Sequence, residues 1–243
     1  MSEGDHFARR LLTSVDAQGY GPSTDRRQGG IQRALLAVLD DAAARAGLRR
    51  DRWERQVAGD GELAVLPPDE PEPRVVDDYV MCLAGALRRA NRDGRRLRLR
   101  LAVHHGTAVR GAQSHDGAGV VEVSRLCDSS VLRNALTASE ADLVVLLSER
   151  VFQDVVRNEY TSLSPSDFRE VRVTVKEYDR PAYLYLPGHD AHSLDLSAPA
   201  PRTAGPSPAP AGHPNIANVF HAPVDARGSV FGPYFGDTRS REA

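Results

Sequence analysis

The sequence predicts an α+β fold, a ferredoxin-like βαββαβ core with an additional C-terminal hairpin. In residues 1–187, segments with apolar residues at helical spacing alternate with short apolar or alternating segments typical of strands. Their early order is strand, helix, strand, helix, strand, followed by further elements. We therefore expect one domain over residues 1–187, with a mostly antiparallel sheet and helices on one side.

Five elements make up the first part of this domain. Apolar residues recur at spacings of three and four in both expected helices, and Gly47 ends the first of them. The last strand alternates strictly (LRLRLAVHH), which predicts one solvated face and assigns Arg95, Arg96, Arg98 and Arg100 to it. The expected elements are strands at 7–15, 62–66 and 97–105 and helices at 29–46 and 74–92.

The second part of the domain contains shorter elements. Residues 143–147 are continuously apolar, and the segment 142–147 is predicted to be a buried strand between two short helices at 131–138 and 149–157. Two alternating segments, 170–178 and 182–186, predict a closing hairpin with Asp179 and Arg180 at its turn.

Composition changes after residue 187. Residues 188–214 are rich in Pro, Ala, Ser and Gly, so they bury too little apolar surface to offset their ordering entropy and predict a disordered linker. Residues 215–243 form a short tail that is apolar again. One interpretation of residues 215–235 is a strand that folds back on the domain. The other is a resemblance to bacterial amyloid signalling motifs, which implies a protein partner that stacks on this segment.

Charge and cysteine content exclude several classes of protein. The 243 residues carry 31 Lys and Arg against 33 Asp and Glu, so there is no overall basic footprint for nucleic acid. Cys82 and Cys127 cannot form a disulfide framework, which suits a reducing, cytoplasmic compartment. The longest aliphatic run is five residues, far short of the roughly 20 that a membrane helix needs, and no membrane association is expected.

Two carboxylates lie beside glycines at strand ends. Asp16 stands in SVDAQGYG and Asp60 in VAGDGEL, where glycine lets the backbone approach a ligand. Carboxylates on neighbouring strands are typical ligands for the Mg²⁺ that accompanies a nucleoside triphosphate. The alternative is that both are ordinary turn residues.

The order of these motifs resembles the catalytic domain of class III nucleotide cyclases, the adenylyl and guanylyl cyclase family. The family's first motif is similar to Asp16-Ala-Gln-Gly19-Tyr20, and its Gly-Asp hairpin turn is similar to Gly59-Asp60-Gly61. A Gly-x-x-Val-Asn-x-x-x-Arg-Leu stretch is similar to residues 117–126 (GAGVVEVSRL). The closing hairpin also fits, so the resemblance spans about residues 7–187.

The resemblance implies a chemistry and a set of residue roles. Asp16 and Asp60 would hold two Mg²⁺ or Mn²⁺ ions, and Arg125 would stabilise the transition state as the catalytic residue. The ribose 3′-oxygen attacks the α-phosphorus, pyrophosphate leaves, and the site forms in a head-to-tail homodimer. Gly19 and Tyr20 would contact the nucleoside triphosphate beside the metals.

Several positions depart from the family pattern. The transition-state Asn is Val121, which offers no hydrogen bond, the base-reading Lys is Gln56, and its partner is Ala118. Lys176 lies near the position of the phosphate-contacting Lys in the last hairpin. Gln56 and Arg125 also fit plain surface positions on a strand and a helix.

Three functions are compatible with these residues. The leading hypothesis is a divergent cyclase that converts a nucleoside triphosphate to a 3′,5′-cyclic mononucleotide, in signalling or a conflict system. The second is a catalytically inactive nucleotide-binding dimerisation module, and the third is an effector recruited through its C-terminal tail.

Overall fold

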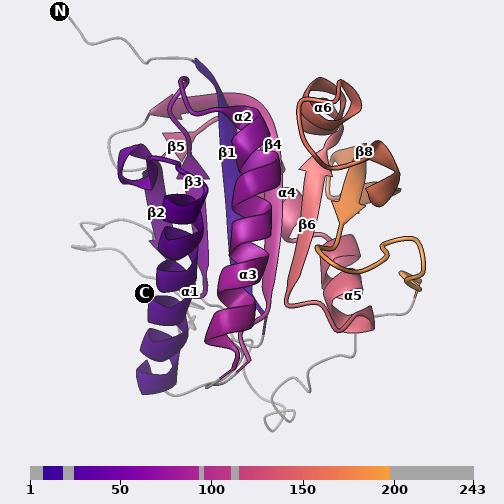
Figure 1. Cartoon of the computed structure of the whole chain (residues 1–243). Coiled ribbons are helices and arrows are strands. Elements are labelled where there is room, and N and C mark those ends of the chain that lie inside the picture. The colour runs from indigo at the N-terminus through magenta and orange to yellow at the C-terminus, as the bar shows by residue number, and fades with distance from the viewer. Residues whose placement is uncertain (1–7, 19–24, 93–95, 111–114, 198–243) are drawn as a thin grey trace, which may run out of the picture. The chain divides into compact units, whose positions relative to one another are not determined.

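A twisted sheet forms the centre of the computed structural model, which describes residues 8–18, 25–92, 96–110 and 115–197 (Figure 1). Its strands are β1 (Ala8–Ala17), β2 (Glu54–Ala58), β3 (Gly61–Val65), β4 (Leu99–Arg110), β5 (His115–Asp116), β6 (Leu143–Ser148), β7 (Arg169–Val175) and β8 (Tyr178–Tyr185). The strand order is β2-β3-β1-β4-β6-β8-β7, and β5 pairs with the end of β4. Every described strand pair is antiparallel except β4 with β6.

The first four strands form the predicted ferredoxin-like core. Helix α1 (Asp25–Arg45) connects β1 to β2, and a helical segment connects β3 to β4, which gives the order β4-β1-β3-β2. That segment consists of α2 (Glu72–Arg74), a π-helical stretch (Val75–Tyr79) and α3 (Val80–Ala90). The α+β class and the core topology are therefore confirmed.

One face of the sheet is covered by α1, α3 and α6 (Glu149–Val151), with the π-helical stretch Phe152–Arg157 that continues α6 (Figure 1). Leu35 and Leu39 of α1 and Leu83 and Leu87 of α3 are fully buried against this face. Their spacing of four places each pair on one side of its helix, as the periodicity predicts.

The opposite face is covered as well, so the expectation of helices on one side is wrong. Helices α4 (Ala118–Cys127) and α5 (Ser130–Ala138) pack there, with Val123 and Leu126 of α4 buried against Ala102 of β4. The alternation assigns the two faces of β4 correctly, but Arg98 and Arg100 lie under helices instead of in solvent. Arg96 is exposed as expected, and Arg95 lies outside the described residues. The small Ala102 side chain leaves room for α4.

Helix α4 lies unusually close to β4. A Cβ added to Gly119 would lie 2.7 Å from the carbonyl oxygen of Thr107 and 2.8 Å from the carbonyl carbon of Gly106. Real Cβ atoms essentially never approach backbone so closely, so this crossing requires glycine. The position of α4, and of every side chain it carries, therefore depends on Gly119.

We expect Gly119→Ala to lower the free energy of unfolding by roughly 1–3 kcal/mol, because the added methyl group forces α4 away from β4. Gly85→Ala in α3 is the matched control, since its new Cβ would meet only the flexible end of Arg89, at 3.4 Å. That exchange should stabilise the protein by about 0.5–1 kcal/mol. Urea denaturation of both variants measures the difference, and equal effects would contradict the close approach.

The closing hairpin is present, but its turn is not at Asp179 and Arg180. Thr174 pairs with Asp179, and the turn residues are Lys176 and Glu177, with a positive φ of 53° at Lys176. Asp179 accepts two hydrogen bonds from Arg172, both 2.8 Å long, across the strands. Pro181 is accommodated inside β8 because the ladder with β6 begins only at Ala182.

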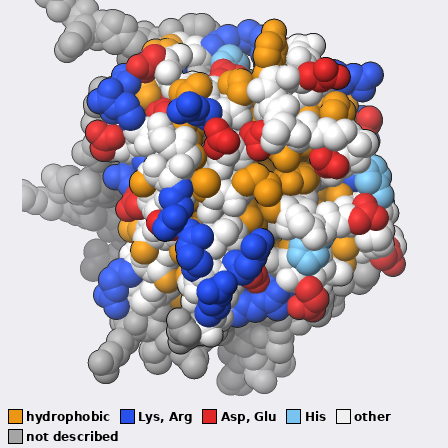
Figure 2. Space-filling model, in the orientation of Figure 1, with side chains coloured by type: hydrophobic (Ala, Val, Ile, Leu, Met, Phe, Trp, Pro, Cys, Tyr) orange, Lys and Arg blue, Asp and Glu red, His pale blue; other side chains and the backbone are white. Residues whose placement is uncertain are grey.

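The chain continues along the domain after β8. Residues 188–197, at the start of the predicted linker, include the buried Ala191, and Leu194 and Leu196 pack against the α5 side of the core. The remainder of the predicted linker and the tail lie outside the described residues. Among the described residues, no helix has both the length and the apolarity needed to cross a membrane. Figure 2 shows acidic and basic side chains interspersed over the face that carries α1 and α3.

Candidate functional site

A pocket of about 300 Å³ lies where β1, the β2–β3 hairpin and the end of α4 meet. Asp16, Gln56 and Asp60 line it, together with Cys127 and Asp128 from the end of α4. The two acids that the sequence singles out therefore share one pocket, as expected.

The backbone fixes the two acids relative to each other. Asp16 pairs with Gly61 in the β1–β3 ladder, and the amide of Ala17 donates a 3.0 Å hydrogen bond to the carbonyl of Asp60. Gly59 has a φ of +57°, and a Cβ on Gly61 would lie 2.9 Å from the carbonyl oxygen of Val15. The Gly-Asp-Gly sequence is thus needed for this turn to pack on the end of β1.

Arg100 of β4 forms an ion pair with Asp16. Its Nε donates a 2.6 Å hydrogen bond to Oδ1 of Asp16, and its terminal nitrogen donates to Oδ2, so the pair is bidentate. The Arg100 side chain is only 13 % exposed. Assigning Arg100 to a solvated strand face was wrong, because that face lies under α4.

Burial dominates the electrostatics of the pocket. It raises the pKa of the Asp16 carboxyl above its ordinary value, and the ion pair with Arg100 opposes this rise. The nearby charges of Asp60 and Asp128 raise the pKa of Asp16 further. Burial likewise raises the pKa of Asp60. Three carboxylates in one partly buried space repel each other, which is typical of a functional pocket.

A buried ion pair supports the hairpin that carries Asp60. Arg50 donates hydrogen bonds of 2.6 and 2.9 Å to the two carboxylate oxygens of Glu62, which follows Asp60 by two positions. The side chains of Arg50 and Glu62 are 5 % and 2 % exposed. Arg50 also donates a 2.7 Å hydrogen bond to Asp40 of α1, so it fastens the hairpin to that helix.

Arg125 and Val121, at the positions that the resemblance assigns to the transition state, lie on α4 outside the Asp16 pocket. Arg125 of α4 pairs with Glu177 at 2.7 Å, which brings it to the turn that holds Lys176. Val121 lies one helical turn before Arg125 and is 46 % exposed. The described lining of the Asp16 pocket includes neither Arg125 nor Lys176.

The remaining residues that the resemblance implies do not all lie at the Asp16 pocket. Gln56 lines the Asp16 pocket, so its position fits a group that contacts a ligand there. Ala118 lines a different pocket, at the other end of α4. Gly19 and Tyr20 lie outside the described residues.

The pocket has the type of donor atom that binds a divalent cation, but these atoms are not arranged as a metal site. Carboxylate oxygens are the ligands that Mg²⁺ prefers. Both oxygens of Asp16 are bonded to Arg100, however, and no group of three or more His, Cys, Asp or Glu side chains in the described part of the chain is arranged to hold a metal ion. Arg100 therefore competes with a cation for the charge and the lone pairs of Asp16.

Comparisons with known proteins define the fold. No family model matches the chain, and no curated protein sequence matches it. Among solved structures, it is similar to the guanylyl cyclase Cya2, with a TM-score of 0.52 at 13 % identity over 79 % of this chain and 99 % of that one. It is also similar to a bacterial light-regulated adenylyl cyclase, with a TM-score of 0.54 at 11 % identity over 75 % of this chain and 53 % of that one.

A third similar structure is the catalytic core of a rhodopsin-guanylyl cyclase, with a TM-score of 0.50 at 15 % identity, covering 73 % of this chain and 97 % of that one. That structure contains ATPαS. The chain therefore has the fold of adenylyl and guanylyl cyclase catalytic domains.

Proposed function

We propose that this protein is a divergent nucleotide cyclase that converts a nucleoside triphosphate to a 3′,5′-cyclic mononucleotide and pyrophosphate. The observation that carries the proposal is the convergence of Asp16 and Asp60, from two strands, on one pocket of a cyclase fold. Divalent ions held by these acids would lower the pKa of the attacking hydroxyl and balance the charge of the triphosphate.

The division of the site residues supports a head-to-tail homodimer. In one protomer, Asp16, Asp60 and Gln56 line the pocket, whereas Arg125 and Lys176 lie with Glu177. A second copy would place its Arg125 and Lys176 over the pocket of the first. Arg125 would then stabilise the charge that develops on the α-phosphate, and Lys176 would bind the departing phosphates.

Product analysis tests this proposal. Purified protein is incubated with Mn²⁺ or Mg²⁺ and all four nucleoside triphosphates, and the products are separated by chromatography. We expect one cyclic mononucleotide at a low rate, because the loss of one donor at Val121 costs roughly 10²- to 10³-fold. No cyclic product from any triphosphate, with pyrophosphate release at background, would reject catalysis.

A second candidate is an inactive nucleotide-binding dimerisation module. The bidentate pair of Arg100 with Asp16 favours it, since the pair neutralises one of the two acids that catalysis needs. This candidate predicts triphosphate binding without turnover.

The variant Arg100→Gln tests whether the ion pair with Arg100 limits cation binding at Asp16. If Arg100 keeps Asp16 from acting on a cation, the variant should show a larger Mn²⁺-dependent rise in melting temperature than the wild type. Arg45→Gln on the surface of α1 is the charge-matched control, with an exposed pair to Asp41. An equal Mn²⁺ response in all three proteins would show that Arg100 does not control the site.

The C-terminal tail remains a proposal from the sequence alone. We infer that residues 215–235 recruit a protein partner or a second copy through amyloid-like stacking. Deleting residues 213–243 should then abolish self-association or partner capture without changing nucleotide binding. Unchanged assembly of the truncated protein would reject this role.

A further inference from the structure

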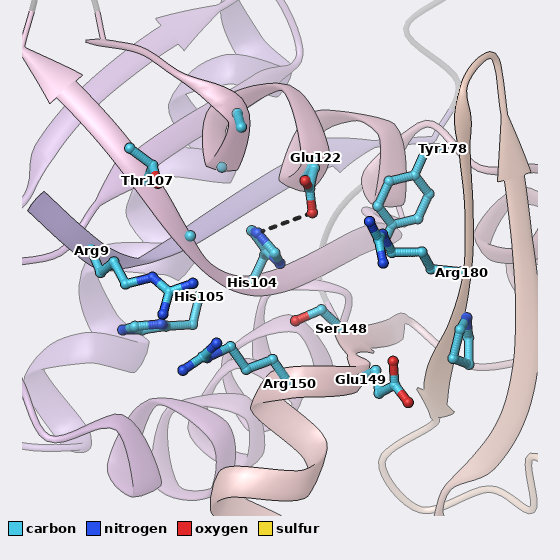
Figure 3. A pocket seen from close by; sticks show the side chains of 14 residues that line it. Arg9, His104, His105, Thr107, Glu122, Ser148, Glu149, Arg150, Tyr178 and Arg180 are labelled. Carbon is cyan, nitrogen blue, oxygen red and sulfur yellow. Dashed lines mark ion pairs between the residues drawn. The ribbon is translucent and has the colours of Figure 1, made fainter. Parts of the chain in front are cut away.

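A second pocket, of about 380 Å³, lies at the other end of the sheet from Asp16 (Figure 3). Arginines from three separate elements reach into it: Arg9 from β1, Arg150 from α6 and Arg180 from β8. In Figure 3, the guanidinium groups of Arg9 and Arg150 lie beside His105, whereas that of Arg180 lies on the other side of His104, beside Tyr178 and Glu122. Side chains far apart in the sequence thus place positive charge on two sides of the pocket.

Three buried polar atoms in this pocket have no hydrogen-bond partner. They are Nδ1 of His104, Nδ1 of His105 and Oγ of Ser148, which account for three of the four such side-chain atoms in the described residues. Ser148 is 3 % exposed and stands at the N-cap of α6, yet its hydroxyl makes no capping hydrogen bond. Buried polar groups are normally hydrogen-bonded, so these three atoms are available to a ligand that enters the pocket.

The pocket lies where two parallel strands separate. The ladder between β4 and β6 ends at Val103 and Leu147, and the next residues of each strand, His104 and Ser148, line the pocket. The sheet therefore opens at this point, and the two strand ends form one wall of the pocket.

The charges of the pocket favour an anion. Burial, together with the charges of His105, Arg150 and Arg180, lowers the pKa of His104 to about 4. Two carboxylates also line the pocket. Glu122 lies 3.5 Å from Nε2 of His104, and Glu149 points away from the guanidinium of Arg150 in Figure 3. Arg150 also forms an ion pair with Asp154 on its own helical segment, with 3.5 Å between Nε and Oδ2. Three guanidinium groups therefore line the pocket against two carboxylates, an excess of one positive charge.

We propose that this pocket binds a small organic phosphate, with Arg9 and Arg150 on one side of the ligand, Arg180 on the other, and the hydroxyl of Ser148 in the wall between them. Guanidinium groups match phosphate oxygens in bidentate geometry, and the arginines outnumber the carboxylates of the lining. Tyr178 and Pro181 provide apolar surface beside Arg180 for the organic part of the ligand. The volume exceeds that of a single ion and suits a small ligand.

Calorimetry and thermal shift with phenyl phosphate test the site on the full-length protein. EDTA is present throughout, so that no divalent ion can assist phosphate binding at the Asp16 pocket. We expect phenyl phosphate to bind and to raise the melting temperature, and inorganic phosphate to do so more weakly. Phenol, succinate and NaCl of matched ionic strength should have no effect.

Two variants connect the binding to the proposed residues. Arg180→Gln and Ser148→Ala should each weaken phenyl phosphate binding, by roughly tenfold or more for the charged group. Ser148→Ala removes an unsatisfied buried hydroxyl, so the ligand-free variant should be at least as stable as the wild type. Arg157→Gln is the charge-matched control. Arg157 ends the π-helical stretch that continues α6 and lies outside the pocket lining, so this variant should bind phenyl phosphate as the wild type does.

Three outcomes would overturn the proposal: no response to phosphate compounds, an equal response to succinate, or normal binding by both pocket variants. Asp60→Asn separates this site from the proposed cyclase site, because it should bind phenyl phosphate in EDTA as the wild type does. Loss of phosphate binding in that variant would move the site to the Asp16 pocket and reject the proposal.

Discussion

Replacing Arg50 with Met is expected to lower the free energy of unfolding by about 3–5 kcal/mol. The exchange removes the only group that donates hydrogen bonds to the Glu62 carboxylate among the described contacts and leaves that charge almost fully buried. An unpaired buried charge costs far more than the intact pair contributes. Urea denaturation of the purified variant measures the loss.

Two further variants show whether the buried charge is the cause. Glu62→Leu combined with Arg50→Met removes both charges, so the double variant should be more stable than Arg50→Met alone. Arg45→Met breaks only an exposed pair with Asp41 in α1 and should cost less than about 1 kcal/mol. A loss below about 1 kcal/mol for Arg50→Met would contradict the structural role of the pair.

Asp60→Asn should reduce cyclic product by at least roughly 10²- to 10³-fold and abolish triphosphate binding in the presence of Mg²⁺. Of the two acids that the sequence singles out, Asp60 is the one whose carboxylate is not paired with Arg100 in the described contacts, so it is more available to a cation than Asp16. Product chromatography and calorimetry of the variant measure the two effects. Asp51→Asn, on the surface before β2, is the matched control and should change neither.

Asp60→Asn should leave the free energy of unfolding unchanged or raise it. Because burial raises the pKa of Asp60, the folded protein binds its proton more tightly than the unfolded chain does. Ionising this group therefore destabilises the fold above the unfolded pKa, and stability falls as pH rises through that window. The Asn side chain has no charge to bury, so Asp60→Asn should be more stable than the wild type at neutral pH. This difference in the free energy of unfolding should disappear as pH falls below the ordinary carboxyl pKa. A variant that loses both binding and stability would indicate a structural role only.

Periodicity and turn chemistry predicted most of the fold. The spacing of Leu35 and Leu39, and of Leu83 and Leu87, identified the helix faces that pack on the sheet. The same evidence could not predict α4, because its close approach to β4 depends on Gly119, and glycine within a helix is ordinarily a weak signal. The hairpin turn was misplaced because Lys176 adopts a positive φ that its residue type does not suggest.

The candidate site was predicted only in part. Glycines at strand ends identified Asp16 and Asp60, since local sequence specifies such turns. Arg100 and Asp128 were missed, because their presence in the pocket depends on α4 covering one face of β4. Alternation shows that Arg100 shares a face with Arg98, but it does not show what covers that face. Long-range packing, which has no local signature, decides which charges meet.

Calorimetric titration of a nucleoside triphosphate with Mg²⁺ into the wild type and Asp60→Asn shows whether Asp16 and Asp60 form a nucleotide site. Both candidate functions require the triphosphate to bind at the pocket that Asp16 and Asp60 share. We predict saturable binding to the wild type and none to Asp60→Asn, with Asp51→Asn behaving as the wild type. No binding to the wild type by any of the four triphosphates, or equal binding to Asp60→Asn, would contradict the account.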